Sequence, residues 1–334
     1  MGSNPDRLSF KVLELDRTAA TDEILASIKS TVLKKFRKRG AVVGISGGID
    51  SSVVAALCVR ALGSKRVHLL LMPEGESAST DDSTRLGREL AESLGVQPEL
   101  EDITSVLKGT RCYERRDAAI REVIPEYGPG WKSKIVLPSV IQSDQFRIFS
   151  VIAHSPEGEE FKARLKPEGY LGIVAATNFK QRTRKMMEYY HADRLNFAVA
   201  GTPNLLEYDQ GFFVKGGDGL ADFKPIAHLY KSQVYQLAEH LGVPEEIRNR
   251  PPTTDTYSLP QSQEEFYFSL PYDKMDLCLW AKNHDVAAEE TGEALGLTAE
   301  QVERVYRDID AKRRMAAYLH AQPAFSGEPD GPSF

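Results

Sequence analysis

The sequence of 334 residues has few cysteines and no long apolar run. Its three cysteines, Cys58, Cys112 and Cys278, are too few and too far apart for a disulfide framework or a cysteine-based metal site. We interpret them as packing residues in a reducing cytoplasm. The longest apolar stretches, around residues 53–59 and 67–72, are far shorter than the roughly 18 residues that span a bilayer. The N-terminus is polar rather than signal-like, so we expect no membrane segment and a cytoplasmic location.

An excess of positive charge is also missing. Lys and Arg number 42 against 48 Asp and Glu, which gives a formal net charge of −6. Proteins whose main partner is a nucleic acid backbone carry a basic excess, so no nucleic acid partner is expected. The hydrophobic fraction of 41% and the charged fraction of 27% are ordinary for a chain that folds around a core. The length allows two domains, or one large α/β domain with an insertion.

Short apolar runs alternate with helical patterns along most of the chain. The runs typical of buried strands are residues 41–46, 67–72, 100–103 and 196–200. The segments typical of helices are residues 21–38, 52–62, 80–94 and 229–241. Parallel strands need crossover connections, which helices supply. The pattern therefore predicts an α/β fold, with a Rossmann-like parallel sheet and helices on both faces.

We treat residues 1–334 as a single domain with an insertion at residues 108–177. Apolar and polar side chains alternate from Phe146 to Ala153, and the chain turns at residues 156–158 before it extends again to Leu165. This pattern predicts an inserted β-hairpin. The chain from Leu277 onward reads as helical, and residues 322–334 read as a loose C-terminal tail.

A glycine-rich turn, Ser46-Gly47-Gly48-Ile49-Asp50-Ser51, separates the first expected strand from its helix. Unpaired backbone N–H groups and the positive end of a helix dipole attract anions at such a place. We expect Gly44 and the turn to bind a pyrophosphate, with a divalent cation between Asp50 and the phosphates. A plain strand-to-helix turn with a Ser or Asp cap is the alternative. No lysine follows as it does in γ-phosphoryl-transfer loops, so that reaction is not indicated.

The turn resembles the Ser-Gly-Gly-x-Asp-Ser signature of PP-loop ATP pyrophosphatases, a family of the adenine nucleotide alpha-hydrolase type. These enzymes cleave ATP between its α and β phosphates and adenylate a substrate oxygen, after which a nucleophile displaces AMP. Residues 201–207 and 211–222 are similar to the pattern of the NAD synthetases within that family. Shorter segments around residues 178–184, 230–231, 252–255, 270–276 and 312–313 continue the resemblance in the same order.

The resemblance implies that nicotinic acid adenine dinucleotide, ATP and ammonia are converted to NAD, AMP and pyrophosphate. The residues that would bind ATP are Gly44, Ser46, Gly47, Gly48, Asp50, Ser51, Arg184, Thr202, Lys231, Thr253 and Lys312. The residues that would bind the carboxylate substrate are Asn178, Arg182, Lys215, Asp218 and Asp222. Asp50 and Glu207 would hold Mg²⁺, and Asp50, Lys231 and Asp218 would be catalytic, with Asp218 accepting the proton of ammonium.

The resemblance also implies a homodimer, and the apolar side chains of Leu277, Leu279 and Trp280 are candidates for its interface. The sequence lacks room for a nitrilase-like glutaminase, and no cysteine precedes the glycine-rich turn. Ammonia is therefore expected from solution or from a separate glutaminase.

Two alternatives remain at this stage. The unusual Pro203 and Leu205-Leu206, together with the insertion, leave open a related amide ligase that acts on a different carboxylic acid. An inactive nucleotide-binding module is the second alternative. His191, His228 and His240 have no partner at a recognisable spacing and are interpreted as structural.

Overall fold

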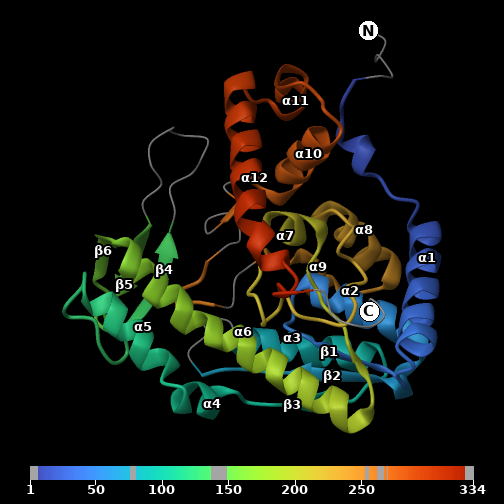
Figure 1. Ribbon diagram of the computed structural model, residues 1–334, viewed down its shortest axis with the longest axis horizontal. Coiled ribbons are helices and arrows are strands. Elements are labelled where there is room, and N and C mark those ends of the chain that lie inside the picture. Colours follow the sequence, from blue (N-terminus) through green and yellow to red (C-terminus); the bar gives the residue numbers. More distant parts are fainter. Residues whose placement is uncertain are drawn as a thin grey trace.

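A four-stranded parallel sheet lies at the centre of the protein (Figure 1). The computed structural model describes residues 7–75, 80–136, 149–252, 256–261, 267–268 and 270–327. The strand order is β3-β2-β1-β7, with β1 at Ala41–Gly44, β2 at Val67–Leu71, β3 at Glu99–Leu100 and β7 at Ala198–Val199. Ala41 pairs with Val67 on one side and with Ala198 on the other. Strand β1 is therefore central, and its carboxyl end leads into the glycine-rich turn.

Helices cover both faces of this sheet, which confirms the predicted fold. One face shares a core with α1 (Arg17–Lys29), α2 (Ile49–Leu62), α3 (Thr80–Ser93) and α8 (Lys231–Leu241). The other face packs against α4 (Thr104–Gly109), α5 (Cys112–Arg121) and the 29-residue helix α6 (Pro167–Leu195). Strands β1 and β2 are buried on both sides, which explains why their sequences are continuously apolar.

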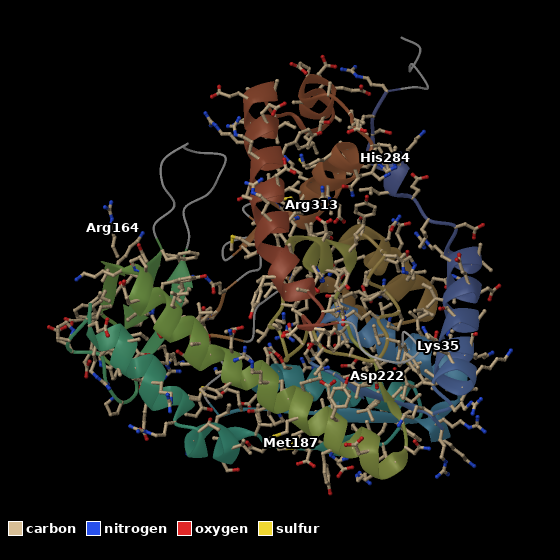
Figure 2. All side chains as sticks on the ribbon, viewed as in Figure 1. Lys35, Arg164, Met187, Asp222, His284 and Arg313 are labelled. Atoms are coloured by element: carbon tan, nitrogen blue, oxygen red, sulfur yellow. The ribbon has the colours of Figure 1, made fainter. Side chains whose placement is uncertain are left out.

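The predicted β-hairpin is present as β5 (Ser150–His154) and β6 (Glu160–Arg164), which are antiparallel. Residues 146–148 of that expected hairpin lie outside the described residues. A further strand, β4 (Lys132–Val136), pairs with β5 and makes the sheet three-stranded. Apolar side chains of this sheet share a core with α5 and the first turns of α6, whereas Arg164 points away from the molecule (Figure 2). The insertion limits at residues 108 and 177 fall inside α4 and α6.

The helices near the C-terminus form a second core. They are α10 (Tyr272–Asn283), α11 (Ala288–Leu295) and α12 (Ala299–His320), which pack with α7 (Leu205–Gln210) and η1 (Phe10–Leu13). Leu277 and Leu279 are fully buried in this core, and the Trp280 ring stacks on His284 with ring centroids 3.9 Å apart. The expectation that Leu277 and Leu279 contact a partner subunit is therefore wrong, because their own chain already covers them.

Several element boundaries differ from the sequence prediction for local reasons. Helix α1 begins at Arg17 because the Asp16 carboxylate accepts the Ala19 N–H at 3.0 Å and caps it. Its continuation, Ser30–Lys35 (η2), is a π-helix. The remaining short helices are η3 at Ser64–Arg66 and α9 at Glu245–Asn249.

Two expectations concern the ends of the chain and the membrane. Residues 322–327 of the expected tail form neither helix nor strand, and residues 328–334 lie outside the described residues. None of the helices in the described part of the chain combines the length and the apolar character needed to traverse a bilayer.

Candidate active site

The glycine-rich turn joins β1 to α2 and presents the first turn of that helix to a cavity. Gly47 has φ +69°, and a Cβ atom there would lie 2.7 Å from the backbone oxygen of Ser83, so only glycine fits. Gly48 caps α2 without a side-chain hydrogen bond. The hydroxyl oxygens of Ser46 and Ser51 lie 3.2 Å apart across the turn. Two hydroxyls and a helix N-terminus thus face the cavity at this glycine-rich turn, an arrangement that favours anions.

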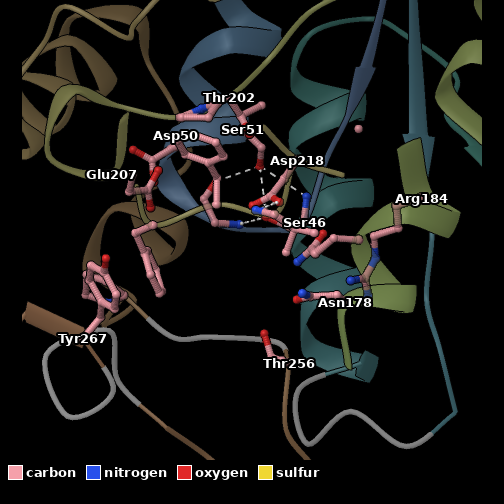
Figure 3. A pocket seen from close by; sticks show the side chains of 18 of the residues that line it. Ser46, Asp50, Ser51, Asn178, Arg184, Thr202, Glu207, Asp218, Thr256 and Tyr267 are labelled. Carbon is pink, nitrogen blue, oxygen red and sulfur yellow. Dashed lines mark hydrogen bonds between the residues drawn. The ribbon is translucent and has the colours of Figure 1, made fainter. Parts of the chain in front are cut away.

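The cavity above this turn has a volume of about 890 Å³. Its walls come from the β1–α2 turn, one side of α6, the loop at residues 200–218, and helices α8 and α12. Figure 3 shows Asp50, Glu207 and Asp218 reaching into it from different elements. The sequence-predicted residues that line it are Gly44, Ser46, Gly48, Asp50, Ser51, Asn178, Arg182, Arg184, Thr202, Glu207, Lys215, Asp218, Lys231 and Lys312.

Asp50 and Glu207 are connected through the buried side chain of Asn204. The Asn204 amide nitrogen donates to Asp50 Oδ1 at 3.0 Å, and its amide oxygen accepts the backbone N–H of Glu207 at 3.1 Å. Glu207 Oε2 accepts the Asn204 N–H at 3.3 Å, which completes a capping box at the start of α7. Two carboxylates 157 positions apart in sequence are thereby held near one another in a defined orientation.

Lys231 forms an ion pair with the other oxygen of Asp50. Its side chain is only 2% exposed, at the start of α8. Burial alone would lower the pKa of Lys231, but the charges of Asp50 and Glu207 outweigh burial and raise this pKa above its ordinary value. The ammonium group therefore remains charged, as a fixed positive group beside the glycine-rich turn.

A second group of ionisable side chains lies where α6 approaches the loop at residues 211–222. The Lys185 ammonium donates to Glu188 Oε2 at 2.5 Å, and both side chains are buried. Burial raises the pKa of Glu188, and burial also raises the pKa of Asp218, although the nearby Lys185 and the Val214 N–H oppose the latter shift. Asp218 Oδ1 accepts that N–H at 2.8 Å. Asp218 is thus a partly buried carboxyl whose basicity exceeds that of an exposed aspartate.

Three basic residues of the cavity already have partners. Arg182 Nε donates to the Lys215 backbone oxygen at 3.3 Å, and Lys215 Nζ donates to the Tyr318 backbone oxygen at 2.8 Å. Lys312 Nζ forms an ion pair with Asp308 at 2.7 Å. The contact between Lys215 and Tyr318 attaches the loop at residues 211–222 to α12, which forms one wall of the cavity.

Two expected site residues do not line the cavity. Gly47 supports the turn but does not line the cavity. Asp222 is exposed and accepts hydrogen bonds from the Val199 N–H at 2.7 Å and the Tyr189 hydroxyl at 3.1 Å. Thr253 lies outside the described residues.

The sequence prediction missed Lys185, Glu188, Asn204 and Arg250 among the residues of this region. Lys185 and Glu188 follow Asn178 and Gln181 at helical spacing on the side of α6 that lines the cavity. That signal was available, but residues 178–184 were considered only as a continuation of the family resemblance. Lys180 instead forms a buried ion pair with Glu74 at 2.6 Å.

A local sequence pattern identifies Asn204 but not Arg250. The three-residue spacing from Asn204 to Glu207 is a capping-box signature, so the cap could have been found. Arg250 donates to the Ser83 hydroxyl at 3.2 Å beside the turn, and no local pattern marks it.

The parallel sheet, the helices on both of its faces and the glycine-rich turn define an α/β protein of the adenine nucleotide alpha-hydrolase fold. The chain belongs to the NAD synthase family, whose model matches residues 20–122 and 141–316. It is 60% identical over 327 residues to the NH(3)-dependent NAD(+) synthetase of Rhizobium meliloti (strain 1021), covering 97% of each chain. It is 58% identical to the protein of the same name from Mesorhizobium japonicum, covering 95% of this chain and 99% of that one.

Solved structures show the same fold at lower identity. The NMN synthetase of Francisella tularensis superposes with a TM-score of 0.61 at 20% identity, covering 95% of this chain and all of that one. The NH3-dependent NAD synthetase of Campylobacter jejuni superposes with a TM-score of 0.59 at 23% identity, covering 94% of this chain and all of that one. Since these two proteins differ in name but share the fold, the fold alone does not select the carboxylate substrate.

Proposed function

We propose that this protein is an ammonia-dependent NAD synthetase, a carbon–nitrogen ligase. It uses ATP to adenylate the pyridine carboxylate of nicotinic acid adenine dinucleotide, and ammonia then displaces AMP to form the amide. The observation that supports this most is the convergence of the phosphate-binding turn, the Asp50–Asn204–Glu207 connection and Lys231 on one cavity. The 60% identity to a relative of that name favours this carboxylate over another acid.

In the adenylation step the residues around the turn would stabilise the leaving pyrophosphate. Negative charge develops on the bridging oxygen as the bond between the α and β phosphates breaks. The N–H groups and hydroxyls of residues 46–51 and the charged Lys231 would contact the phosphates there. Preorganised donors of this kind contribute strongly to catalysis because they need no reorganisation during the reaction.

The donor set beside the turn fits a magnesium ion. Carboxylate oxygens are ligands that Mg²⁺ prefers, and it is bound through one or two carboxylates together with substrate phosphates. Asp50 and Glu207 would provide those carboxylates, and Asn204 restricts the orientation of both. When bound, the ion would neutralise charge on the ATP phosphates.

Asp218 is the residue proposed to assist ammonia. Most ammonia in neutral solution is ammonium, whereas attack on the adenylate carbon requires the neutral amine. A carboxylate whose pKa is raised by burial attracts the cation and is a better proton acceptor than an exposed aspartate. Lys215, Arg182 and Asn178 also line the cavity and would bind the dinucleotide.

The nitrogen source provides the direct test of this function. We expect purified protein to form NAD with ammonium chloride, ATP and nicotinic acid adenine dinucleotide, and to form none with glutamine alone. Product is measured by chromatography, and AMP release with other carboxylates is measured in parallel. Efficient use of glutamine by the purified chain would contradict the ammonia-dependent assignment. If the purified chain does not use glutamine, ammonia in the cell would come from solution or from a separate glutaminase.

We also propose a homodimer. Leu277 and Leu279 are excluded from its interface, but α6 carries the exposed apolar side chains of Leu171, Met186 and Tyr190. We expect light scattering to give a molar mass of twice the 37.2 kDa of one chain. A mass of one chain at every concentration tested would contradict the dimer.

A further inference from the structure

Two histidines and a glutamate meet between the sheet and α6, in a place that the cavity does not use. His68 lies on β2, Glu99 on β3 and His191 on α6. Glu99 Oε2 is 3.1 Å from His68 Nε2 and 3.6 Å from His191 Nδ1. One ligand atom from each residue lies within 4.8 Å of the other two.

These separations match those of a small four-coordinate metal ion. Zinc binds histidine nitrogen and carboxylate oxygen at roughly 2.0–2.2 Å, so neighbouring ligand atoms of a tetrahedral site lie about 3.4 Å apart. The two distances from Glu99 are close to that value. The third separation, between the two imidazole nitrogens, is within 4.8 Å. Imidazole nitrogens favour zinc-class transition metals over magnesium.

A carboxylate on the side of the ring away from Glu99 orients the His191 imidazole. Its Nε2 atom lies 3.0 Å from Glu101 Oε1, and the side chain is only 1% exposed. A carboxylate in this position selects the tautomer with the proton on Nε2. The lone pair of Nδ1 then faces Glu99. Histidines that bind a metal through one ring nitrogen usually donate the N–H of the other to a carboxylate or carbonyl in this way.

His68 offers the second imidazole nitrogen of this group, its Nε2 atom. Its Nε2 atom is buried and has no hydrogen-bond partner among the described residues, although it lies close to the Glu99 carboxylate. A buried polar atom in this state calls for an explanation. This nitrogen and His191 Nδ1 face the same Glu99 oxygen, so a cation placed there would contact both rings.

A guanidinium group lies at the same place. Arg194 Nη2 is 2.8 Å from Glu99 Oε2 and 2.7 Å from His191 Nδ1. The Arg194 side chain is 39% exposed and can turn into solvent. Its contacts show that both ligand atoms face a position that attracts a cation. Glu99 and Glu101 leave the group with net negative charge when the imidazoles are neutral.

We propose that His68, Glu99 and His191 form a binding site for a zinc-class divalent metal, which displaces Arg194 and leaves one coordination position open to water. The site would connect the two-residue edge strand β3 to β2 and to α6. Helix α6 also carries Lys185 and Glu188 into the cavity. The metal would therefore stabilise the packing of α6 on the sheet without taking part in the reaction.

The experiment is a titration of chelator-treated full-length protein with zinc chloride. Excess magnesium is present so that zinc does not occupy Asp50 and Glu207. We expect calorimetry to give one zinc ion per chain and zinc to raise the melting temperature. His68→Gln and Glu99→Gln should each weaken zinc binding by about tenfold or more. Both side chains are more exposed than that of His191, so these variants should fold. His240→Gln on the surface of α8 is the matched control and should bind zinc normally.

Arg194→Ala separates a metal site from a plain hydrogen-bond network. If zinc displaces the guanidinium, removal of this competitor should tighten zinc binding severalfold. Absence of zinc binding at micromolar concentrations in the wild type would overturn the proposal. Wild-type affinity in both His68→Gln and Glu99→Gln would overturn it as well, because zinc would then bind elsewhere.

Discussion

Replacement of Asp50 by asparagine is expected to lower the rate of NAD formation by about 100-fold or more. The substitution keeps the size of the side chain but removes the negative charge that faces Lys231 and that would bind Mg²⁺. Asn204 can still contact the side chain at this position, so the local geometry should change little. The loss should therefore appear in turnover and in the dependence of ATP binding on magnesium.

The measurement compares ATP binding with and without Mg²⁺ by calorimetry, together with turnover and circular dichroism. Asp22→Asn on the exposed surface of α1 is the control and should behave as the wild type. Loss of Asp50 leaves the Lys231 charge without its nearest partner, so some stability can be lost. Rates are therefore normalised to the folded fraction. If the Asp50→Asn protein retains wild-type turnover and the same magnesium dependence, Asp50 is not a metal ligand.

The central part of the site could be predicted because its residues are contiguous. The turn at residues 46–51 carries the glycines, hydroxyls and carboxylate of a phosphate site within six positions. The strand before it and the helix after it follow from simple apolar patterns. The parallel sheet followed from the same patterns, because few other arrangements connect buried strands through helices.

The contacts that complete the site could not be predicted from local patterns. The ion pair between Asp50 and Lys231 joins positions 181 apart, and the hydrogen bond from Asn204 to Asp50 joins positions 154 apart. No spacing rule covers such separations. They depend on how α6 and α8 pack on the sheet, and α6 itself was not predicted, because its first part lay in the assumed insertion and residues 178–184 were considered only for their family resemblance.

The prediction that Leu277 and Leu279 lie in a dimer interface failed for a related reason. An apolar side chain in a C-terminal helix can face either its own core or a partner, and the sequence pattern is the same in both cases. Leu277 and Leu279 are fully buried between α10 and the neighbouring helices of the same chain. Burial of this kind becomes apparent only when the packing of α11 and α12 is known.

Replacement of Asp218 by asparagine is expected to separate the two halves of the reaction. Adenylation uses ATP, magnesium and the carboxylate, none of which requires a base at Asp218. Release of pyrophosphate in the absence of ammonia should therefore continue in the variant. Amide formation should slow by about 100-fold or more, which is the usual contribution of a positioned general base, and the ammonia requirement should rise.

The pH dependence gives a second readout for Asp218. Only the ionised carboxylate binds ammonium and accepts its proton, and burial raises the pKa of this group. Wild-type amide formation should therefore decline as the pH falls through that raised pKa, at a higher pH than an exposed aspartate would give. The decline should be absent from the slower Asp218→Asn protein, because asparagine does not titrate. The assay follows amide formation against ammonium concentration at several pH values, with Asp22→Asn as the control. An unchanged ammonia dependence and an unchanged acidic limb in the Asp218→Asn protein would remove this residue from the mechanism, since neither a proton acceptor nor an ammonium-binding anion can be lost without altering both.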